Sequence, residues 1–164
     1  MNRKMRRFKQ ELTEAMAKDV LTRNGVGVLA LNGDDGYPYG VPVNYVYADG
    51  AIYFHSAIAG YKNELIEKDG KTSFTVIDKA TNVPENVTTY FRSVIVTGKV
   101  SLVTDETEKR KGLDYLWQKF CPEFEDKAVA EIISDGKRTA MFKVVIEELR
   151  GKEAIELVRE REGK

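Results

Sequence analysis

This chain of 164 residues carries 26 basic and 26 acidic side chains, so its formal net charge is zero. That balance argues against a protein that binds nucleic acid by neutralising phosphates, because such proteins carry a surplus of Lys and Arg. Hydrophobic residues form 42% of the sequence, enough for one core, and we expect a single domain over residues 1–164. One cysteine and one histidine exclude an internal disulfide and a two-histidine zinc motif.

The N-terminus is basic at Arg3, Lys4, Arg6 and Arg7, and Glu11 begins a series of further charged residues. No uncharged apolar stretch follows the basic residues, so this is not the pattern of a signal peptide. No segment reaches the length of a transmembrane helix. We therefore expect a reduced, cytoplasmic protein with a solvated N-terminal arm.

The first expected elements are a helix and three strands. Apolar residues at helical spacing predict an amphipathic helix over Gln10–Thr22, which Asn24-Gly25 ends. Asp49-Gly50 is typical of a tight hairpin turn between the last two strands. The three strands are Val26–Leu31, Gly40–Tyr47 and Ile52–Ser56.

The middle of the chain continues with a short helix over Asn63–Lys68, a strand over Lys71–Ile77 and a polar connection over Asp78–Glu85. A long β run follows over Arg92–Val103. Gly98 within this run predicts a bulge or a sharp bend, which barrels use at their corners.

The last third holds two helices, over Glu106–Phe120 and Asp126–Ile133, and a final strand over Thr139–Leu149. The charged tail is expected to lie outside a core of about residues 10–150. Short hairpins imply a mainly antiparallel sheet. The predicted fold is α+β: a six-stranded, mainly antiparallel split β-barrel with flanking helices.

The most informative stretch is the one in which a strand passes through a loop into a helix start. It carries the only histidine, His55, then Ser56, and later Gly60 and Lys62. A hydroxyl, exposed backbone N–H groups and one cation beside a helix N-terminus predict a phosphate-binding turn. Such groups can hold a phosphate dianion by charge-assisted hydrogen bonds.

Five segments form an ordered series along the chain. They are Val26-Gly-Val-Leu-Ala-Leu31, Tyr37-Pro-Tyr-Gly-Val-Pro-Val-Asn-Tyr45, Ile52-Tyr-Phe-His-Ser-Ala57 with Gly60-Tyr-Lys62, Ser73-Phe-Thr-Val76 and Tyr90-Phe-Arg-Ser-Val-Ile-Val-Thr-Gly98. This series resembles the pyridoxamine 5'-phosphate oxidase-like, FMN-binding split-barrel proteins, and most closely their Nim-type nitroimidazole-resistance group. The resemblance covers about residues 5–150.

The resemblance implies a homodimer with two FMN sites at the subunit interface; FAD or haem is the less expected cofactor. It places the flavin phosphate at the strand and loop that carry His55, Ser56, Ala57 and Lys62. It places the isoalloxazine along Val43, Asn44 and Tyr45. A partner subunit would add contacts from Thr88 to Ser93, among them Thr89 and Ser93.

The sequence departs from the family pattern at two places. Tyr61 stands where the closest relatives often have histidine, and the arginine-rich C-terminal signature of true pyridoxamine-phosphate oxidases is absent. We therefore do not expect vitamin B6 synthesis.

Several of these residues also have an ordinary structural interpretation. Lys62 could be an ordinary surface lysine. His55 could form hydrogen bonds with backbone groups of the loop; its other alternative role is to ligate haem. The Asn44 amide can both donate and accept hydrogen bonds. It could therefore bond either the edge of a flavin ring or the end of a neighbouring strand. Cys121, at a helix end, is expected to be a buried, inert thiol.

Three functions stay open at this point. The first is an FMN-dependent oxidoreductase that reduces small organic acceptors such as nitroaromatic compounds, in which the flavin carries the chemistry. The second is a non-catalytic protein that binds flavin or haem. The third is an interaction domain without a cofactor. No residue in the sequence identifies the electron acceptor or a catalytic side chain.

Overall fold

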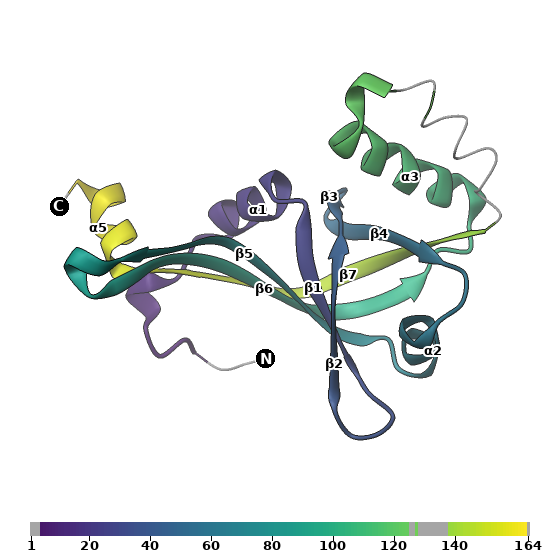
Figure 1. The fold of residues 1–164 in the computed structure, drawn as a ribbon, viewed down its shortest axis with the longest axis horizontal. Coiled ribbons are helices and arrows are strands. Elements are labelled where there is room, and N and C mark those ends of the chain that lie inside the picture. The colour runs from purple at the N-terminus through teal and green to yellow at the C-terminus, as the bar shows by residue number, and fades with distance from the viewer. Residues whose placement is uncertain (1–3, 125–126, 128–137, 164) are drawn as a thin grey trace.

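In the computed structural model, which describes residues 4–124, 127 and 138–163, a seven-stranded sheet organises the molecule (Figure 1). All of its strand pairs are antiparallel, in the order β2-β1-β5-β6-β7-β4-β3. The strands are β1 (Val26–Asn32), β2 (Pro38–Asn44), β3 (Val46–Ala48), β4 (Ala51–Ala57), β5 (Lys71–Val83), β6 (Thr88–Leu102) and β7 (Thr139–Glu153).

Helices flank this sheet, which confirms the α+β class. The Thr13 hydroxyl accepts a hydrogen bond from the N–H of Met16, so the first helix begins after Thr13 rather than at the expected Gln10. The described helices are α1 (Glu14–Arg23), α2 (Tyr61–Lys68), α3 (Glu106–Phe120) and α5 (Ile155–Glu162), with 3-10 turns at Phe8–Gln10, Pro84–Asn86 and Pro122–Phe124.

The sheet has seven strands rather than the expected six because the strand predicted over Gly40–Tyr47 is interrupted at Tyr45. The Tyr45 side chain is fully buried, and its hydroxyl donates to the carbonyl of Leu21 at 2.8 Å. Its backbone N–H donates to Gly25 at 2.9 Å instead of joining the sheet. The pieces on either side, β2 and β3, pair with opposite ends of the sheet. The chain therefore links the two edges, and the sheet curves into a split barrel.

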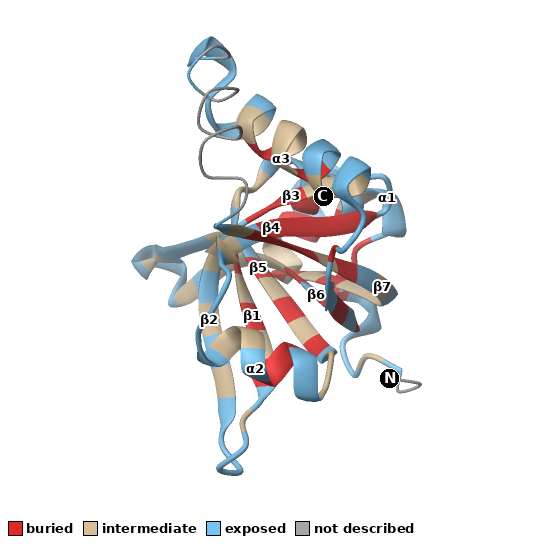
Figure 2. Cartoon of the chain, turned by 90° about the vertical axis from the view of Figure 1, so that its right-hand side faces the viewer, coloured by how far each residue is buried: buried red, intermediate tan, exposed pale blue. Residues whose placement is uncertain are grey.

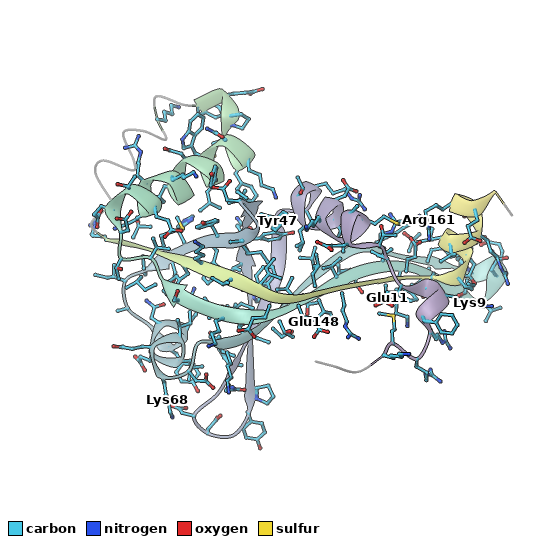
Figure 3. All side chains as sticks on the ribbon, turned by 180° about the vertical axis from the view of Figure 1, so that it is seen from behind. Lys9, Glu11, Tyr47, Lys68, Glu148 and Arg161 are labelled. Atoms are coloured by element: carbon cyan, nitrogen blue, oxygen red, sulfur yellow. The ribbon has the colours of Figure 1, made fainter. Side chains whose placement is uncertain are left out.

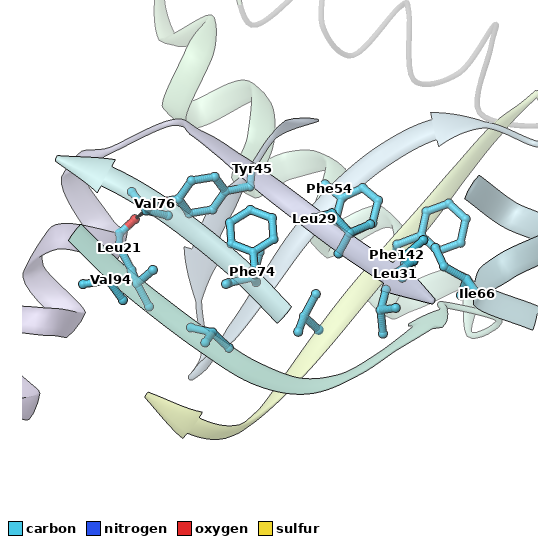
Figure 4. Close-up of a cluster of buried hydrophobic side chains, with 14 of the residues drawn as sticks. Leu21, Leu29, Leu31, Tyr45, Phe54, Ile66, Phe74, Val76, Val94 and Phe142 are labelled. Atoms are coloured by element: carbon cyan, nitrogen blue, oxygen red, sulfur yellow. Dashed lines mark hydrogen bonds between the residues drawn. The ribbon is translucent and has the colours of Figure 1, made fainter. Parts of the chain in front are cut away.

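The main hydrophobic core fills the inside of this curved sheet (Figure 4). A second cluster lies between the outside of the barrel and α3. On β4, Phe54 belongs to the inner cluster and Tyr53 to the outer one, as the alternation of a strand requires. β4 is thus buried on both faces from Ala51 to Phe54 and becomes exposed at His55 (Figure 2). A rigid strand therefore carries the predicted phosphate-binding residues at its open end.

The β5–β6 hairpin is longer than expected and forms an arm that leads away from α2 and α3 (Figure 1). The prediction of a polar connection over Asp78–Glu85 is wrong, because β5 continues to Val83 and pairs with β6 along its whole length. Polar side chains on an exposed arm gave no apolar alternation to signal the strand. The expected irregularity at Gly98 is confirmed by a register shift between Thr97 and Gly98.

The charged C-terminal segment does not lie outside the core as expected. β7 continues to Glu153, and Leu157 and Val158 of α5 are buried. Cys121 is exposed, against the expected buried thiol. The helix expected over Asp126–Ile133 falls outside the described residues apart from position 127. Within the described part of the chain, no helix is long and apolar enough to cross a membrane.

Candidate functional site

The turn from His55 to Lys62, called here the 55–62 turn, joins the end of β4 to the start of α2. β7 holds its first part, since His55 pairs with Met141 and Ala57 with Thr139. The Asn63 side-chain amide donates to the carbonyl of Ala57 at 2.8 Å and ties the helix back to the strand. Four predicted phosphate-site residues, His55, Ser56, Ala57 and Lys62, thus belong to one supported turn.

The start of α2 leaves backbone donors free. Gly60 precedes the helix with φ 136°, a conformation that favours glycine, and supplies no side-chain cap. Its carbonyl accepts from the N–H groups of Asn63 and Glu64 at 2.9 and 3.3 Å. Among the described residues, the N–H groups of Tyr61 and Lys62 have no acceptor. Unpaired N–H groups at a helix start are suited to an anion.

Lys62 is half-buried beside this helix start, and burial lowers the pKa of its ammonium. Its Nζ lies 5.8 Å from the centre of the Phe54 ring. No carboxylate of the described residues forms an ion pair with it. Burying a cation without a counter-charge is costly, so an anionic ligand would relieve that cost.

His55 lies close enough to Lys62 for their charges to interact. Burial first, and the Lys62 charge second, lower the pKa of the His55 imidazole. The imidazole is therefore neutral near pH 7 and offers one N–H donor and one acceptor nitrogen. Asn63, which the sequence analysis did not single out, adds another polar atom: its Oδ1 is buried and unpaired among the described residues. This oxygen could accept a hydrogen bond from a ligand hydroxyl. The sequence could have indicated Asn63 by its position in the first helical turn, three residues after Gly60.

The second predicted group, Val43, Asn44 and Tyr45, is divided by the strand alternation. Val43 pairs with Gly27 on the inner face, and Tyr45 is fully buried with its hydroxyl engaged. Burial raises the pKa of Tyr45, so its hydroxyl stays protonated. Only the Asn44 side chain is exposed on the outer face, opposite Val26. The Tyr45 side chain therefore belongs to the core and does not face a ligand in this chain.

The third group, Thr89 and Ser93, lies elsewhere in the same chain. Ser93 pairs with Lys152 on β7, whereas His55 pairs with Met141, roughly 35 Å away along that strand. The Thr89 hydroxyl donates to the side-chain oxygen of Asn82 at 2.9 Å within the β5–β6 arm. One chain does not bring these residues to the 55–62 turn.

The outer face of the sheet between these groups is apolar and uncovered. Val26, Ile77 and Ile95 are 58%, 63% and 45% exposed. The register places Asn44 opposite Val26 and Ser93 opposite Ile77, so both polar residues share this face with the apolar ones.

A cavity of about 630 Å³ opens beside the 55–62 turn. It lies between α2, the first turn of α3 and the start of β7, and it combines an apolar lining with polar side chains. Residues lining it include Ile58, Asn63, Leu102, Thr104, Met141 and Phe142.

Comparisons with known proteins identify the family and the fold. The protein family described as "Pyridoxamine 5'-phosphate oxidase" matches residues 13–153. Among curated proteins, none matches this chain.

Solved structures share the fold. A candidate 5-nitroimidazole antibiotic resistance protein from Bacteroides thetaiotaomicron is 22% identical, with a TM-score of 0.71 over 87% of this chain and 85% of that chain. An FAD-binding protein from Mesorhizobium loti is 27% identical, with a TM-score of 0.67 over 88% and 97%. An FAD- and haem-binding protein from Mycobacterium smegmatis is 16% identical, with a TM-score of 0.75 over 89% and 73%.

Proposed function

Because this chain belongs to the pyridoxamine 5'-phosphate oxidase family, we propose that it is an FMN-dependent oxidoreductase that holds the flavin phosphate at the 55–62 turn. The observation that carries the proposal is Lys62, a half-buried cation that has no counter-charge among the described residues and lies beside two backbone N–H groups that have no acceptor there. A phosphate dianion supplies the missing charge and accepts these hydrogen bonds.

The other residues of the turn fit the rest of the cofactor. The neutral imidazole of His55 and the hydroxyl of Ser56 can donate to phosphate oxygens. The buried Oδ1 of Asn63, which has no partner in the described part of the chain, can accept from a ribityl hydroxyl. When bound, the flavin supplies the electron transfer; the protein binds it, orients it and excludes water around it.

The electron acceptor in this proposal is a small organic molecule such as a nitroaromatic compound, and a reduced nicotinamide cofactor is the donor. The cavity beside the turn has the size and mixed lining of a small-molecule site. The likeness to the Bacteroides protein makes nitroimidazoles the first acceptors to test. The proposed location is the cytoplasm, where the exposed thiol of Cys121 stays reduced.

The proposal includes a homodimer that forms through the apolar outer face of the sheet. Exposed Val26, Ile77 and Ile95 would be buried against a second copy. Asn44 and Ser93 lie on this same face, and Thr89 lies nearer the start of β6 than Ser93 does. A second copy could therefore bring its Thr89 and Ser93 towards the flavin, which one chain by itself does not do.

A haem- or flavin-binding protein without catalysis is the second candidate. The observation that favours it is the partly exposed His55, whose lowered pKa leaves a neutral imidazole able to ligate iron. The solved Mycobacterium smegmatis protein binds FAD and haem, so both pigments need testing.

The visible spectrum of the purified protein, and the pigment released on denaturation, test these candidates. Flavin absorption with released FMN supports the proposal, and a Soret band favours haem. We expect Lys62→Met to weaken FMN binding about 10- to 100-fold, because a charged hydrogen bond is lost. Lys68→Met, in the same helix but exposed, is the matched control and should bind as the parent does. No pigment and no binding of added FMN would contradict the proposal.

A further inference from the structure

Tyr61, the first residue of α2, is tied to a distant turn. Its hydroxyl donates to Oδ1 of Asp34 at 2.7 Å and accepts from the Asp34 backbone N–H at 3.4 Å. Its ring meets the Tyr39 ring edge-on, with centres 5.1 Å apart. The first residue of α2 is thus attached to both the β1–β2 turn and β2.

The β1–β2 turn is an ordered point of attachment. The Gly33 N–H donates to the Tyr37 carbonyl at 3.1 Å, and the Tyr37 N–H donates to Oδ1 of Asp35 at 3.0 Å. A side chain at Gly33 would lie 2.1 Å from the Tyr37 carbonyl oxygen, so the turn closes tightly. Asp34 is therefore held where it can fix Tyr61.

The Asn63 amide also ties the first turn of α2 to Ala57, but Asn63 follows Lys62, whereas Tyr61 attaches the helix on the N-terminal side of Lys62. This helix has eight residues and no side-chain cap, and nothing lies within 4 Å of the position that a Gly60 side chain would take. A short, uncapped helix frays at its end. Lys62 is the second residue of α2, so fraying would release the cation that the proposed phosphate site requires.

We infer that Tyr61 is a positioning residue, which holds Lys62 and the free N–H groups of the 55–62 turn in the arrangement that receives the flavin phosphate. This inference rests on the proposed function, because it assigns Tyr61 an effect on that same site. Tyr61 acts through Lys62 and touches neither phosphate nor substrate. The hydrogen bond to Asp34 raises the pKa of Tyr61, so the phenol stays protonated and remains a hydrogen-bond donor near neutral pH.

The test is a double-variant cycle on FMN affinity. Tyr61→Phe removes the hydroxyl and keeps the ring, and we expect about three- to ten-fold weaker binding than the parent shows. In the Lys62→Met background, Tyr61→Phe should cause a clearly smaller loss of FMN affinity, because only the free N–H groups are then left to be positioned. The affinity of Tyr61→Phe should also depend less on salt than that of the parent, because Lys62 contributes less. A residue with only a general structural role would not produce this dependence on Lys62.

Two further variants act as a control and as a second approach. Tyr37→Phe removes a hydroxyl from the same turn that makes no hydrogen bond among the described residues, and should bind FMN as the parent does. Asp34→Ala, on the exposed turn, should weaken binding as Tyr61→Phe does, and the two losses should not add.

The outcomes separate this inference from the proposed function. Unchanged affinity in both Tyr61→Phe and Asp34→Ala would overturn the inference while leaving the FMN site. An equal further loss in the Lys62→Met background would also overturn it, because Tyr61 would then act without Lys62. If the parent protein itself does not bind FMN, the proposed function fails, and the inference fails with it.

Discussion

Charged residues behave differently at the two ends of the molecule (Figure 3 places Lys68 of α2 and Arg161 of α5 at opposite ends). At the α5 end, Glu153 is fully buried and binds Arg92 at 2.8 Å and Arg161 at 3.2 Å. Asp78 continues this arginine–carboxylate network through Arg23 at 2.6 Å and Arg92 at 3.4 Å. At the α2 end, Lys62 is half-buried with no carboxylate beside it among the described residues.

The difference indicates which charges serve the fold and which await a ligand. A buried carboxylate is tolerated when cations satisfy it within the chain, and the network then holds α1, the β5–β6 arm and α5 together. The cost at Lys62 is not offset inside the described chain. An anionic ligand can offset it. We therefore assign ligand binding to the 55–62 turn and stabilisation of the fold to the arginine–carboxylate network.

The largest expected effect would come from breaking the network. Arg92→Met leaves Glu153 buried with Arg161 as its remaining partner, and we expect a loss of about 3 kcal/mol in the free energy of unfolding. Urea denaturation measures it, with the exposed Arg159→Met as control. A loss as small as that of the control would mean that the network does not support the fold.

A smaller loss is expected at Tyr45, which separates a core role from a ligand role. Tyr45→Phe removes the 2.8 Å hydrogen bond to Leu21 and leaves that buried carbonyl without its donor, at a cost of about 1–2 kcal/mol in unfolding free energy. FMN affinity should not change, since the side chain lies in the core. Weaker FMN binding by the folded variant would contradict this prediction and would indicate that the Tyr45 hydroxyl takes part in cofactor binding.

Lys62→Met should act in the opposite direction to Arg92→Met. Removing a half-buried cation that has no counter-charge within residues 4–124, 127 and 138–163 should stabilise the ligand-free protein, by about 0.5 kcal/mol because water still screens a partly exposed charge. At the same concentration, added FMN should raise the unfolding midpoint of the parent more than that of the variant. Destabilisation of the ligand-free variant would show that Lys62 serves the fold.

The smallest expected effect is a pH dependence from His55. Its pKa is lowered in the folded state, so the unfolded chain binds the proton more readily. His55 therefore costs stability below its folded pKa, and this cost disappears as the pH rises to the ordinary histidine value of about 6.5. The difference in unfolding free energy between the parent and His55→Gln, measured from pH 5 to 8 without FMN, should show this rise. A constant difference would contradict it.

Local chemistry in the sequence determined much of the structure. The helix Glu106–Phe120 has the expected bounds, because the Asp105 side chain caps its start through the Glu108 N–H. The turn at Asp49 and Gly50 has positive φ at both residues, as the dipeptide predicts. The connection from β4 through Gly60 to α2 could also be predicted, because the apolar strand, the glycine and the helix start are neighbours in the sequence.

Only the tertiary structure decided features that depend on residues far apart in the sequence. The interruption at Tyr45 depends on carbonyls of Leu21 and Gly25, and the contact of Tyr61 depends on Asp34, 27 residues away. The segment Asp78–Asn82 is mostly polar, and it is part of a strand because β6 pairs with it. Charge alone likewise could not separate Glu153 from Lys62: burial makes both costly, and only the fold shows that one has its partner inside the chain.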